Sequence, residues 1–287
     1  MLGLSHWYDL EPCSDSSPDL FKVESRPCES VQVTKISIGA NVSEPTAQVS
    51  DELLAQIFEV SNATILSALR KRGYHKVYME GVKPLTTGRR LCARAITLRN
   101  LPVRPDLAER IATGEHGDGF NNTPRWQAVD NVGPGYALVI DAMRRSNVST
   151  GGDVVFSRIL TRKGDGIVTD GAIRDGAAVA EYGFPVYAGG STSIVGEDHI
   201  LPYSVNEPVQ CGGVLVWPGD IIMGDDDGVV VLPSQLAEEI LPWAIEHDEM
   251  EQAVLEHSIR TGESPAPYYP FNDETKKLWE KWKADLE

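Results

Sequence analysis

The residues best suited to chemistry lie between residues 150 and 175, in a stretch rich in glycine, aspartate and arginine. Gly151 and Gly152 allow a ligand to approach the backbone closely, just before an expected helix. Ser149 and Thr150 are expected to cap that helix, because a side-chain oxygen can accept a hydrogen bond from a first-turn N–H group. The stretch therefore predicts an anion-binding site at a helix N-terminus.

An arginine and three aspartates accompany this helix start: Asp153, Asp170, Arg174 and Asp175. Hard cations such as Mg²⁺ take one or two carboxylates and keep several waters, so one direct aspartate suffices. Arg174 offers a planar, bidentate grip on a carboxylate. A 2-oxo acid fits this set, since its carboxylate meets the arginine and the loop amides while a metal polarises its keto oxygen and stabilises an enolate. Cleavage of the next C–C bond is then a retro-aldol or a decarboxylation. On the residues alone, a purely structural glycine-rich turn stays open as the alternative.

Alternating strands and helices are expected around this stretch. The pattern predicts strands over 136–141, 166–170 and 185–188, and helices over 152–163 and 177–182. Such alternation implies parallel strands with right-handed crossovers. Sites in such sheets lie beyond the carboxyl ends of the strands. Asp141, Asp170 and the Arg174-Asp175 turn all fall at such ends.

The flanking segments predict further elements. Residues 51–58 and 61–72 are expected to form two helices or one broken helix, and a further helix is expected over 235–257. Strands are expected over 31–38, 90–98, 209–217, 220–223 and 229–232. Residues 99–134 are expected to be irregular, with His116 and Asp118 either a ligand pair or part of a solvated insertion. The run of aspartates over 225–228 indicates a hairpin turn rather than a calcium loop, because the twelve-residue ligand spacing is missing. An amphipathic piece near Trp279 is expected to pack on its own domain or on a neighbouring subunit.

Composition narrows the class of partner. The chain has 287 residues, 41% of them hydrophobic, enough for one large domain with extensions. Its formal net charge of −16 disfavours a nucleic-acid partner or an anionic membrane surface. A small anionic substrate is still compatible with this charge, since a local arginine can oppose the global field.

Cysteines and hydropathy favour a cytoplasmic protein. The four cysteines (Cys13, Cys28, Cys92 and Cys211) are widely spaced with no C-x-x-C, as expected for free thiols in a reducing compartment. No apolar run reaches the roughly 18 residues of a membrane span. The first residues lack the basic and apolar regions of a signal peptide.

Four motifs together resemble one superfamily, which contains the regulator of ribonuclease activity A and the 4-hydroxy-4-methyl-2-oxoglutarate aldolases. They are P-G-Y-A-L-V-I-D (134–141), the G-G-D-V-V-F…G-A-I-R-D run (151–175), F-P-V-Y-A-G-G (184–190) and V-W-P-G-D-I-I-M-G-D-D-D-G-V-V-V-L-P (216–233). The resemblance covers roughly residues 50 to 260. The first 45 residues, the enlarged 99–134 region and the tail after about Gly262 depart from the family.

The resemblance implies an α/β sandwich like the swivelling phosphohistidine domain. The residue pattern itself adds mixed parallel and antiparallel strands and helical extensions at the C-terminus. We expect an N-terminal extension (1–48), a catalytic domain (49–262) and a C-terminal tail (263–287). The resemblance also implies homotrimers or homohexamers with sites between subunits. An acidic residue from the neighbouring subunit would complete each site, with Glu249 as the candidate.

The resemblance also assigns roles to residues. Gly152, Asp153, Val154 and Val155 match the substrate-contacting loop, Arg174 the substrate-binding arginine and Asp175 the metal ligand. Asp153 would hold a water and, with Arg174, act in catalysis. The implied function is that of a Mg²⁺- or Mn²⁺-dependent class II pyruvate aldolase, a carbon–carbon lyase acting on a 4-hydroxy- or 4-carboxy-2-oxo acid and also decarboxylating oxaloacetate. The alternative is a non-catalytic regulator that binds and inhibits a ribonuclease.

Overall fold

The computed structural model describes residues 48–113 and 123–286. All of them belong to one compact unit. Several sequence expectations lie outside the described residues: the strand over 31–38, the His116 and Asp118 pair, and Cys13 and Cys28. The division of the chain at 48 and 262 stays a prediction.

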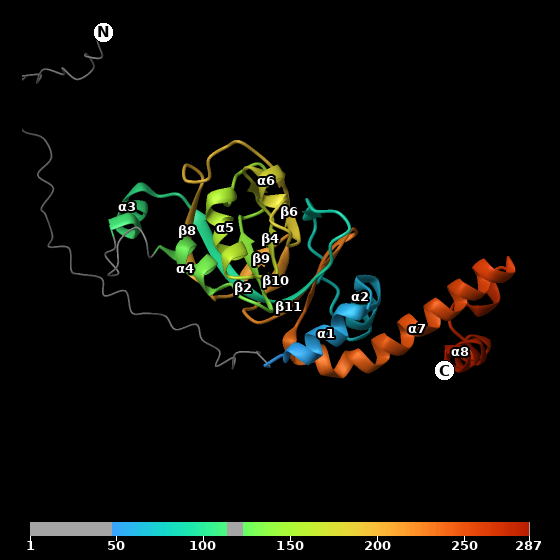
Figure 1. Cartoon of the computed structure of the whole chain (residues 1–287). Coiled ribbons are helices and arrows are strands. Elements are labelled where there is room, and N and C mark those ends of the chain that lie inside the picture. The colour runs from blue at the N-terminus through green and yellow to red at the C-terminus, as the bar shows by residue number, and fades with distance from the viewer. Residues whose placement is uncertain (1–47, 114–122, 287) are drawn as a thin grey trace, which may run out of the picture. The chain divides into compact units, whose positions relative to one another are not determined.

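The described residues contain both helices and strands (Figure 1). The helices are α1 (Asp51–Glu59), α2 (Asn62–Lys71), α3 (Pro105–Thr113), α4 (Pro124–Asn131), α5 (Asp153–Thr161), α6 (Gly176–Ala180), α7 (Ala237–Thr261) and α8 (Asp273–Leu286). The strands are β1 (Lys83–Pro84), β2 (Leu91–Pro102), β3 (Tyr136–Asp141), β4 (Gly166–Thr169), β5 (Ala172–Ile173), β6 (Val186–Ala188), β7 (Gly190–Ser191), β8 (Ile200–Val205), β9 (Val209–Cys211), β10 (Val214–Val216), β11 (Ile221–Asp225) and β12 (Gly228–Leu232). Two short 3₁₀ turns, Ser234–Leu236 and Ala266–Tyr268, flank α7.

One mixed, eight-stranded sheet organises the fold. Its order is β1-β6-β4-β3-β2-β11-β12, with β8 pairing to the second half of β2. The four strands β2, β3, β4 and β6 are parallel, as predicted for β3, β4 and β6, and the outer strands are antiparallel to their neighbours. A bridge between Tyr78 and Val230 brings the two ends of the sheet together, so that the sheet is nearly closed. The predicted mixed α/β fold is confirmed, while the likeness to a swivelling phosphohistidine domain stays a prediction.

Side-chain alternation along the strands divides the core into an inner and an outer layer. On β3, Ala137 and Val139 point into the nearly closed sheet, where they meet the β9–β10 hairpin. Leu138 and Ile140 point outward and pack against α4 and α5. Because the two sets alternate, a one-residue shift in strand pairing would move each set of side chains to the opposite face of the sheet. The burial of both sets therefore fixes the strand register, and with it the positions of the strand ends.

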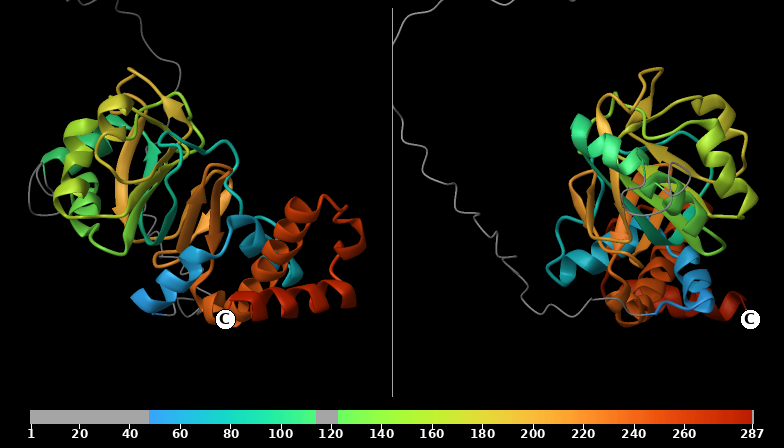
Figure 2. Two further views of the ribbon diagram at one scale, coloured as in Figure 1. Left: turned by 45° about the vertical axis from the view of Figure 1, so that its right-hand side comes forward. Right: turned by 90° about the vertical axis from the view of Figure 1, so that its left-hand side faces the viewer.

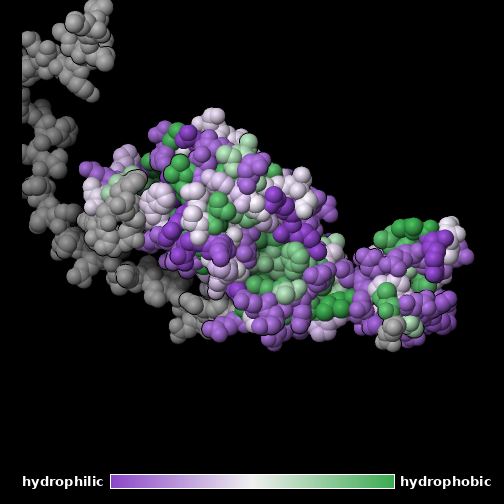
Figure 3. Space-filling view, viewed as in Figure 1, coloured by the Kyte–Doolittle hydropathy of each residue, from purple (hydrophilic) through white to green (hydrophobic). Residues whose placement is uncertain are grey.

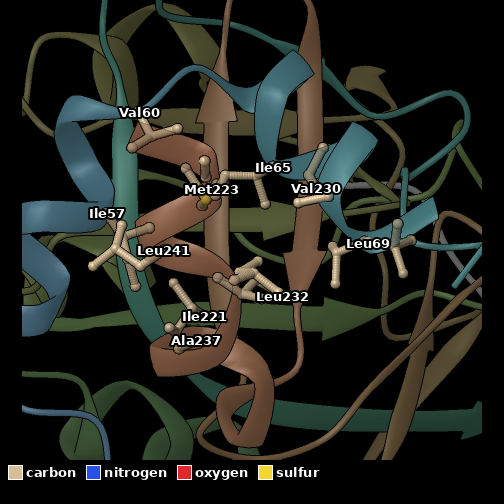
Figure 4. Close-up of a cluster of buried hydrophobic side chains, with 14 of the residues drawn as sticks. Ile57, Val60, Ile65, Leu69, Ile221, Met223, Val230, Leu232, Ala237 and Leu241 are labelled. Atoms are coloured by element: carbon tan, nitrogen blue, oxygen red, sulfur yellow. The ribbon is translucent and has the colours of Figure 1, made fainter. Parts of the chain in front are cut away.

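A third apolar cluster joins the first two helices to β11, β12 and the start of α7 (Figure 4). Ile57, Ile65 and Leu69 pack there with Met223 and Leu232. Ser50 and Ser61 cap α1 and α2, as their types suggest, by accepting bonds from backbone N–H groups. The two predicted N-terminal helices are therefore confirmed.

The C-terminal helix α8 packs on α7 of its own chain (Figure 2). Trp279 Nε1 donates to Glu249 Oε2 at 3.0 Å, and Trp282 Nε1 donates to Glu256 Oε2 at 2.7 Å. Of the two sequence alternatives, the structure shows packing on the own domain. Glu249 is our candidate for the acidic residue that completes the site of a neighbouring subunit. In this chain its carboxylate accepts the hydrogen bond from Trp279 of α8. Figure 3 shows apolar surface on this helical pair. Ile259 of α7 and Leu286 of α8 are both exposed.

The expectation that residues 99–134 are irregular is wrong for the described residues. β2 continues to Pro102 because it pairs there with β8, about a hundred residues later in the chain. Two helices, α3 and α4, each begin with a proline, Pro105 and Pro124. Proline is tolerated in the first helical turn, so these residues start helices rather than break them.

The strand expected over 209–217 is instead a hairpin. Gly212 and Gly213 turn the chain between β9 and β10 with φ of +56° and +80°. Glycine reaches this left-handed region without a steric penalty. The hairpin predicted over 225–228 is confirmed, since β11 and β12 pair across this turn. No helix in the described part of the chain is both long and apolar enough to cross a membrane.

Asp220 provides a test of the buried electrostatics. Its carboxylate is 5% exposed and accepts bonds from the N–H groups of Trp217 and Ser234, at 2.8 and 3.2 Å. Burial raises the pKa of Asp220 to about 6. The folded state therefore binds this proton more tightly than the unfolded state, so the contribution of Asp220 to stability falls as pH rises through the window from about 4 to 6.

We expect Asp220→Asn to remove this pH dependence. Between pH 4 and pH 7, the unfolding free energy of the variant should rise by about 2 to 3 kcal/mol relative to the wild type. Urea unfolding at several pH values measures the difference. The loss of a hydrogen-bond acceptor in the variant shifts its unfolding free energy by the same amount at every pH. Asp106→Asn is the control, because a hydrogen bond from Arg104 lowers the pKa of that exposed carboxylate. The contribution of Asp106 to stability therefore rises with pH, opposite to that of Asp220. Parallel curves for wild type and Asp220→Asn would contradict the prediction.

Candidate active site

The site forms where the residues before α5 run alongside β5. Ser149 forms a parallel bridge with Ala172, and Thr150 N donates to Ala172 O at 2.9 Å. One step further, Arg174 N donates to Gly151 O at 3.0 Å. These are backbone bonds between segments more than twenty residues apart. They hold the glycine loop against the turn that begins at Arg174.

A pocket of about 200 Å³ opens at this junction. It is lined by Arg125, Ser149, Gly151, Gly152, Asp153, Val154, Val155, Arg174, Asp175, Gly196 and Glu197. At about 30 Å³ per molecule this volume equals about seven waters, which suits a small acid better than a nucleotide. Every predicted catalytic, substrate-binding and metal-binding residue lines this one pocket; their roles stay predictions.

Gly152 lies directly against the predicted metal ligand. A Cβ atom at this position would lie 2.8 Å from Asp175 Oδ2 and 3.3 Å from Arg174 Cβ. Asp175 adopts a left-handed conformation, with φ 54° and ψ 34°, at the start of α6. Its exposed carboxylate forms no hydrogen bond or ion pair with another described side chain. It is therefore available to a ligand.

Asp153 and Val154 begin α5 at the edge of the pocket. Asp153 Oδ1 accepts from Val154 N at 2.7 Å, while Tyr182 Oη donates to the Asp153 carbonyl at 2.9 Å. The pKa of Tyr182 is raised, mainly by desolvation and further by the charges of Asp153 and Asp175. Val154 is 73% exposed, so it forms an apolar rim. First-turn N–H groups without an intrahelical partner complete an anion-binding surface.

The predicted caps of this helix are wrong. The N-cap is Gly152, with no side-chain hydrogen bond. Ser149 Oγ donates to Gly151 O at 3.0 Å, and Thr150 Oγ1 donates to Ala172 O at 3.2 Å. Both hydroxyls therefore stabilise the loop rather than the helix. Among the first-turn N–H groups, Val154 N is engaged by Asp153 Oδ1, and those of Asp153 and Val155 are left for a ligand.

Asp170 does not join the site, contrary to the grouping with Asp153 and Asp175. Its carboxylate accepts from the N–H groups of Ala142, Arg144 and Gly212 at 2.6, 3.0 and 3.2 Å. Gln210 links it to Asp141 by donating to both carboxylates. This network holds the chain after β3, where Met143 and Arg144 have positive φ. Both strand-end aspartates are therefore structural.

Sequence reasoning missed the two charged pocket residues Arg125 and Glu197. Arg125 lies in the first turn of α4, inside the region expected to be irregular, and Glu197 lies between β7 and β8. Arg125 Nη1 is 2.8 Å from Glu197 Oε1. The pKa of Glu197 is lowered, first by its hydrogen bond to Arg125 and also by the charge of Arg174. No local pattern signals a pair that is 72 residues apart.

The donor set fits one hard cation held mainly by water. Three carboxylates and two guanidinium groups line the pocket, a formal charge of 2 − 3 = −1. Within residues 48–113 and 123–286, no three His, Cys, Asp or Glu side chains cluster as metal ligands. If the pocket holds Mg²⁺ or Mn²⁺, Asp175 would be its single direct ligand, which is sufficient because these ions keep several waters.

Comparison with known proteins identifies the family. The sequence profile of the RraA-like family, described as Aldolase/RraA, matches residues 46–231. This chain belongs to the RraA-like family. The match contains every pocket residue, together with the sheet that positions them.

Individual relatives carry different names. A putative 4-hydroxy-4-methyl-2-oxoglutarate aldolase of Halalkalibacterium halodurans is 34% identical over 142 residues, which are 50% of this chain and 64% of the relative. Protein DlpA of Legionella pneumophila is 29% identical over 191 residues, 66% of this chain and 29% of that protein. This chain thus spans less than two thirds of either relative. The crystal structure of Streptomyces coelicolor RraAS2, an unusual member of the RNase ES inhibitor RraA protein family, is 32% identical, with a TM-score of 0.63 over 72% of this chain and 96% of that one.

Gly152→Ala tests how closely the loop and Asp175 fit. Gly152 has φ −137°, which any residue adopts, so the added methyl group acts through its contacts with Asp175 and Arg174 rather than through backbone strain. We expect the proposed lyase activity to fall at least tenfold, with the unfolding free energy changed by less than about 1 kcal/mol. Gly133→Ala is the matched control, since its Cβ would meet nothing closer than 4.0 Å. Full activity in Gly152→Ala would show that the loop can move away from Asp175 without loss.

Proposed function

We propose that this RraA-like protein is a divalent-metal-dependent lyase that cleaves a 4-hydroxy- or 4-carboxy-2-oxo acid and releases pyruvate. The observation that carries the proposal is the convergence of Arg174, Asp175 and the N-terminus of α5 on one small pocket. The aldolase name of a relative with 34% identity supports the same chemistry. Oxaloacetate decarboxylation belongs to the proposal, because loss of carbon dioxide leaves the same pyruvate enolate as the retro-aldol step.

Each pocket residue has a defined task in the proposed reaction. Arg174 and the first-turn N–H groups of α5 bind the substrate carboxylate beside the keto group. Asp175 would hold Mg²⁺ or Mn²⁺, which supplies Lewis-acid polarisation of the keto oxygen. Asp153 positions a water that takes the proton of the C4 hydroxyl group. Gly152 keeps these groups close together, since any side chain there would displace Asp175.

Assembly is part of the same proposal. The pocket is open in the single chain, and Arg174 and Asp175 are both exposed. We propose a homotrimer or homohexamer in which a neighbouring subunit covers the pocket and contributes an acidic residue. Light scattering of the purified protein measures the subunit number.

The test of the proposed lyase is a coupled pyruvate assay with 2-oxo dicarboxylates, including oxaloacetate and 4-hydroxy-2-oxoglutarate. Pyruvate should appear with Mg²⁺ or Mn²⁺ and stop in excess EDTA. Activity that is indifferent to EDTA would remove the metal from the proposal. No pyruvate from any member of the panel would remove the lyase.

The alternative is a protein that regulates a ribonuclease by contact. One finding favours it, the likeness to RraAS2, which belongs to an RNase ES inhibitor family. A pull-down with an RNase E-type ribonuclease, followed by an RNA-cleavage assay, tests this alternative. Inhibition without pyruvate release would favour the regulator, and pyruvate release without inhibition would favour the lyase.

A further inference from the structure

Arg125 is held rigidly at one side of the pocket. The helix α4 that carries it is anchored by buried Ala128 and Val129 and by Trp126, which packs against the outer core. The Arg125 side chain is only 18% exposed. Its Nε atom is buried with no hydrogen-bond partner in the described residues. An arginine in this state has an unused donor and a full charge beside a ligand-sized space.

The carboxylate of Glu197 lies in the field of both pocket arginines. It contacts Arg125 at 2.8 Å, and the charges of Arg125 and Arg174 both favour its ionised form. A carboxylate held ionised in this way is a poor proton acceptor, which argues against a role as general base. The Glu197 side chain is 63% exposed, so it can turn into solvent when a ligand takes its place beside Arg125.

We propose that Arg125 is a specificity-determining residue that binds the second carboxylate of a 2-oxo dicarboxylate whose first carboxylate is held by Arg174. In the free protein, Glu197 forms an ion pair with Arg125. The second carboxylate of the ligand replaces Glu197 in this pair when the dicarboxylate enters the pocket. With a divalent cation the lining charge becomes −1 + 2 = +1, which attracts anionic ligands. This inference rests on the proposed function and narrows its substrate class to dicarboxylates.

The test compares two ligands of equal chain length, 2-oxoglutarate and 2-oxopentanoate, which differ by one carboxylate and lack the 4-hydroxyl group. Calorimetry with Mg²⁺ gives the dissociation constants for wild type, Arg125→Gln, Arg125→Lys and Glu197→Gln. We expect the wild type to bind 2-oxoglutarate about 10- to 100-fold more tightly, as for a hydrogen bond to a charged group. Arg125→Gln should reduce this ratio to about one while leaving 2-oxopentanoate unaffected, and Arg125→Lys should restore part of it. Glu197→Gln should bind 2-oxoglutarate more tightly than the wild type, because the competitor of the ligand is gone.

The control is Arg158→Gln, which removes a similar ion pair between α5 and α4, to Asp130, outside the pocket lining. It should leave the ligand ratio unchanged. Equal binding of the two ligands by the wild type, or no binding of either, overturns the inference. So does an equal loss for both ligands in Arg125→Gln, which would indicate a structural role. Pyruvate release by the wild type is measured separately, so a failure of the lyase proposal is distinguished from a failure of this one.

Discussion

Replacing Arg174 with alanine is expected to lower kcat/KM for pyruvate release by at least 100-fold. Charge-assisted, bidentate bonds to a carboxylate are the strong kind, and the reaction loses both binding and orientation of the keto acid without them. Arg174→Lys keeps the charge but not the planar fork, so its activity should be intermediate. Steady-state kinetics with the coupled pyruvate assay measure both variants.

The fold should survive the loss of Arg174. Its guanidinium group is exposed and makes no hydrogen bond or ion pair with the described residues, while the bond from Arg174 N to Gly151 O uses only the backbone. We expect the unfolding free energy to change by less than about 0.5 kcal/mol. Arg158→Ala, which removes an equally charged side chain outside the pocket, is the control and should retain its activity. Wild-type kinetics in Arg174→Ala would eliminate this arginine as the carboxylate receptor.

Asp175→Asn is expected to abolish metal-dependent activity and to weaken Mg²⁺ binding at least tenfold. The amide keeps the shape of the carboxylate but loses the charge that a hard cation requires. Asparagine is also among the residues that tolerate the left-handed region, so the turn with φ 54° is preserved. Alanine would add backbone strain at this position and so confuse a lost ligand with a distorted turn.

Calorimetric titration with Mg²⁺ or Mn²⁺, together with the pyruvate assay, measures the effect of Asp175→Asn. The control is Asp227→Asn, in the acidic hairpin turn over 225–228, where three consecutive aspartates attract cations without a pocket. This control should bind the catalytic metal like the wild type. If Asp227→Asn lost metal binding while Asp175→Asn retained it, the metal would belong to the hairpin.

Local structure was largely predictable from the sequence. Strand β3 has the predicted bounds, and α1, α2, β4 and β6 lie within a residue or two of their expected ranges. Their signals are short-range: a serine cap, a helical apolar stripe, or a run of buried β-formers between glycines. The hairpin over 225–228 follows from turn chemistry in the same way.

The sequence also determined which chemistry-bearing residues belong together. The glycine loop, Arg174 and Asp175 lie close together in the chain, and the motifs around them indicate the RraA-like family before any coordinates are considered. The family was confirmed by the match over residues 46–231.

Only the tertiary structure decided the rest of the site. Asp170 has the residue type and strand-end position of a ligand, but three backbone N–H groups occupy its carboxylate. Arg125 and Glu197 carry no local signal, because they meet across 72 residues through the packing of α4 against the sheet. Helix caps and turns depend on neighbours within a few residues, whereas a pocket depends on which distant segments the sheet brings together. For that reason the sequence predicted the carboxylate and metal side of this pocket, and the fold alone supplied its second arginine.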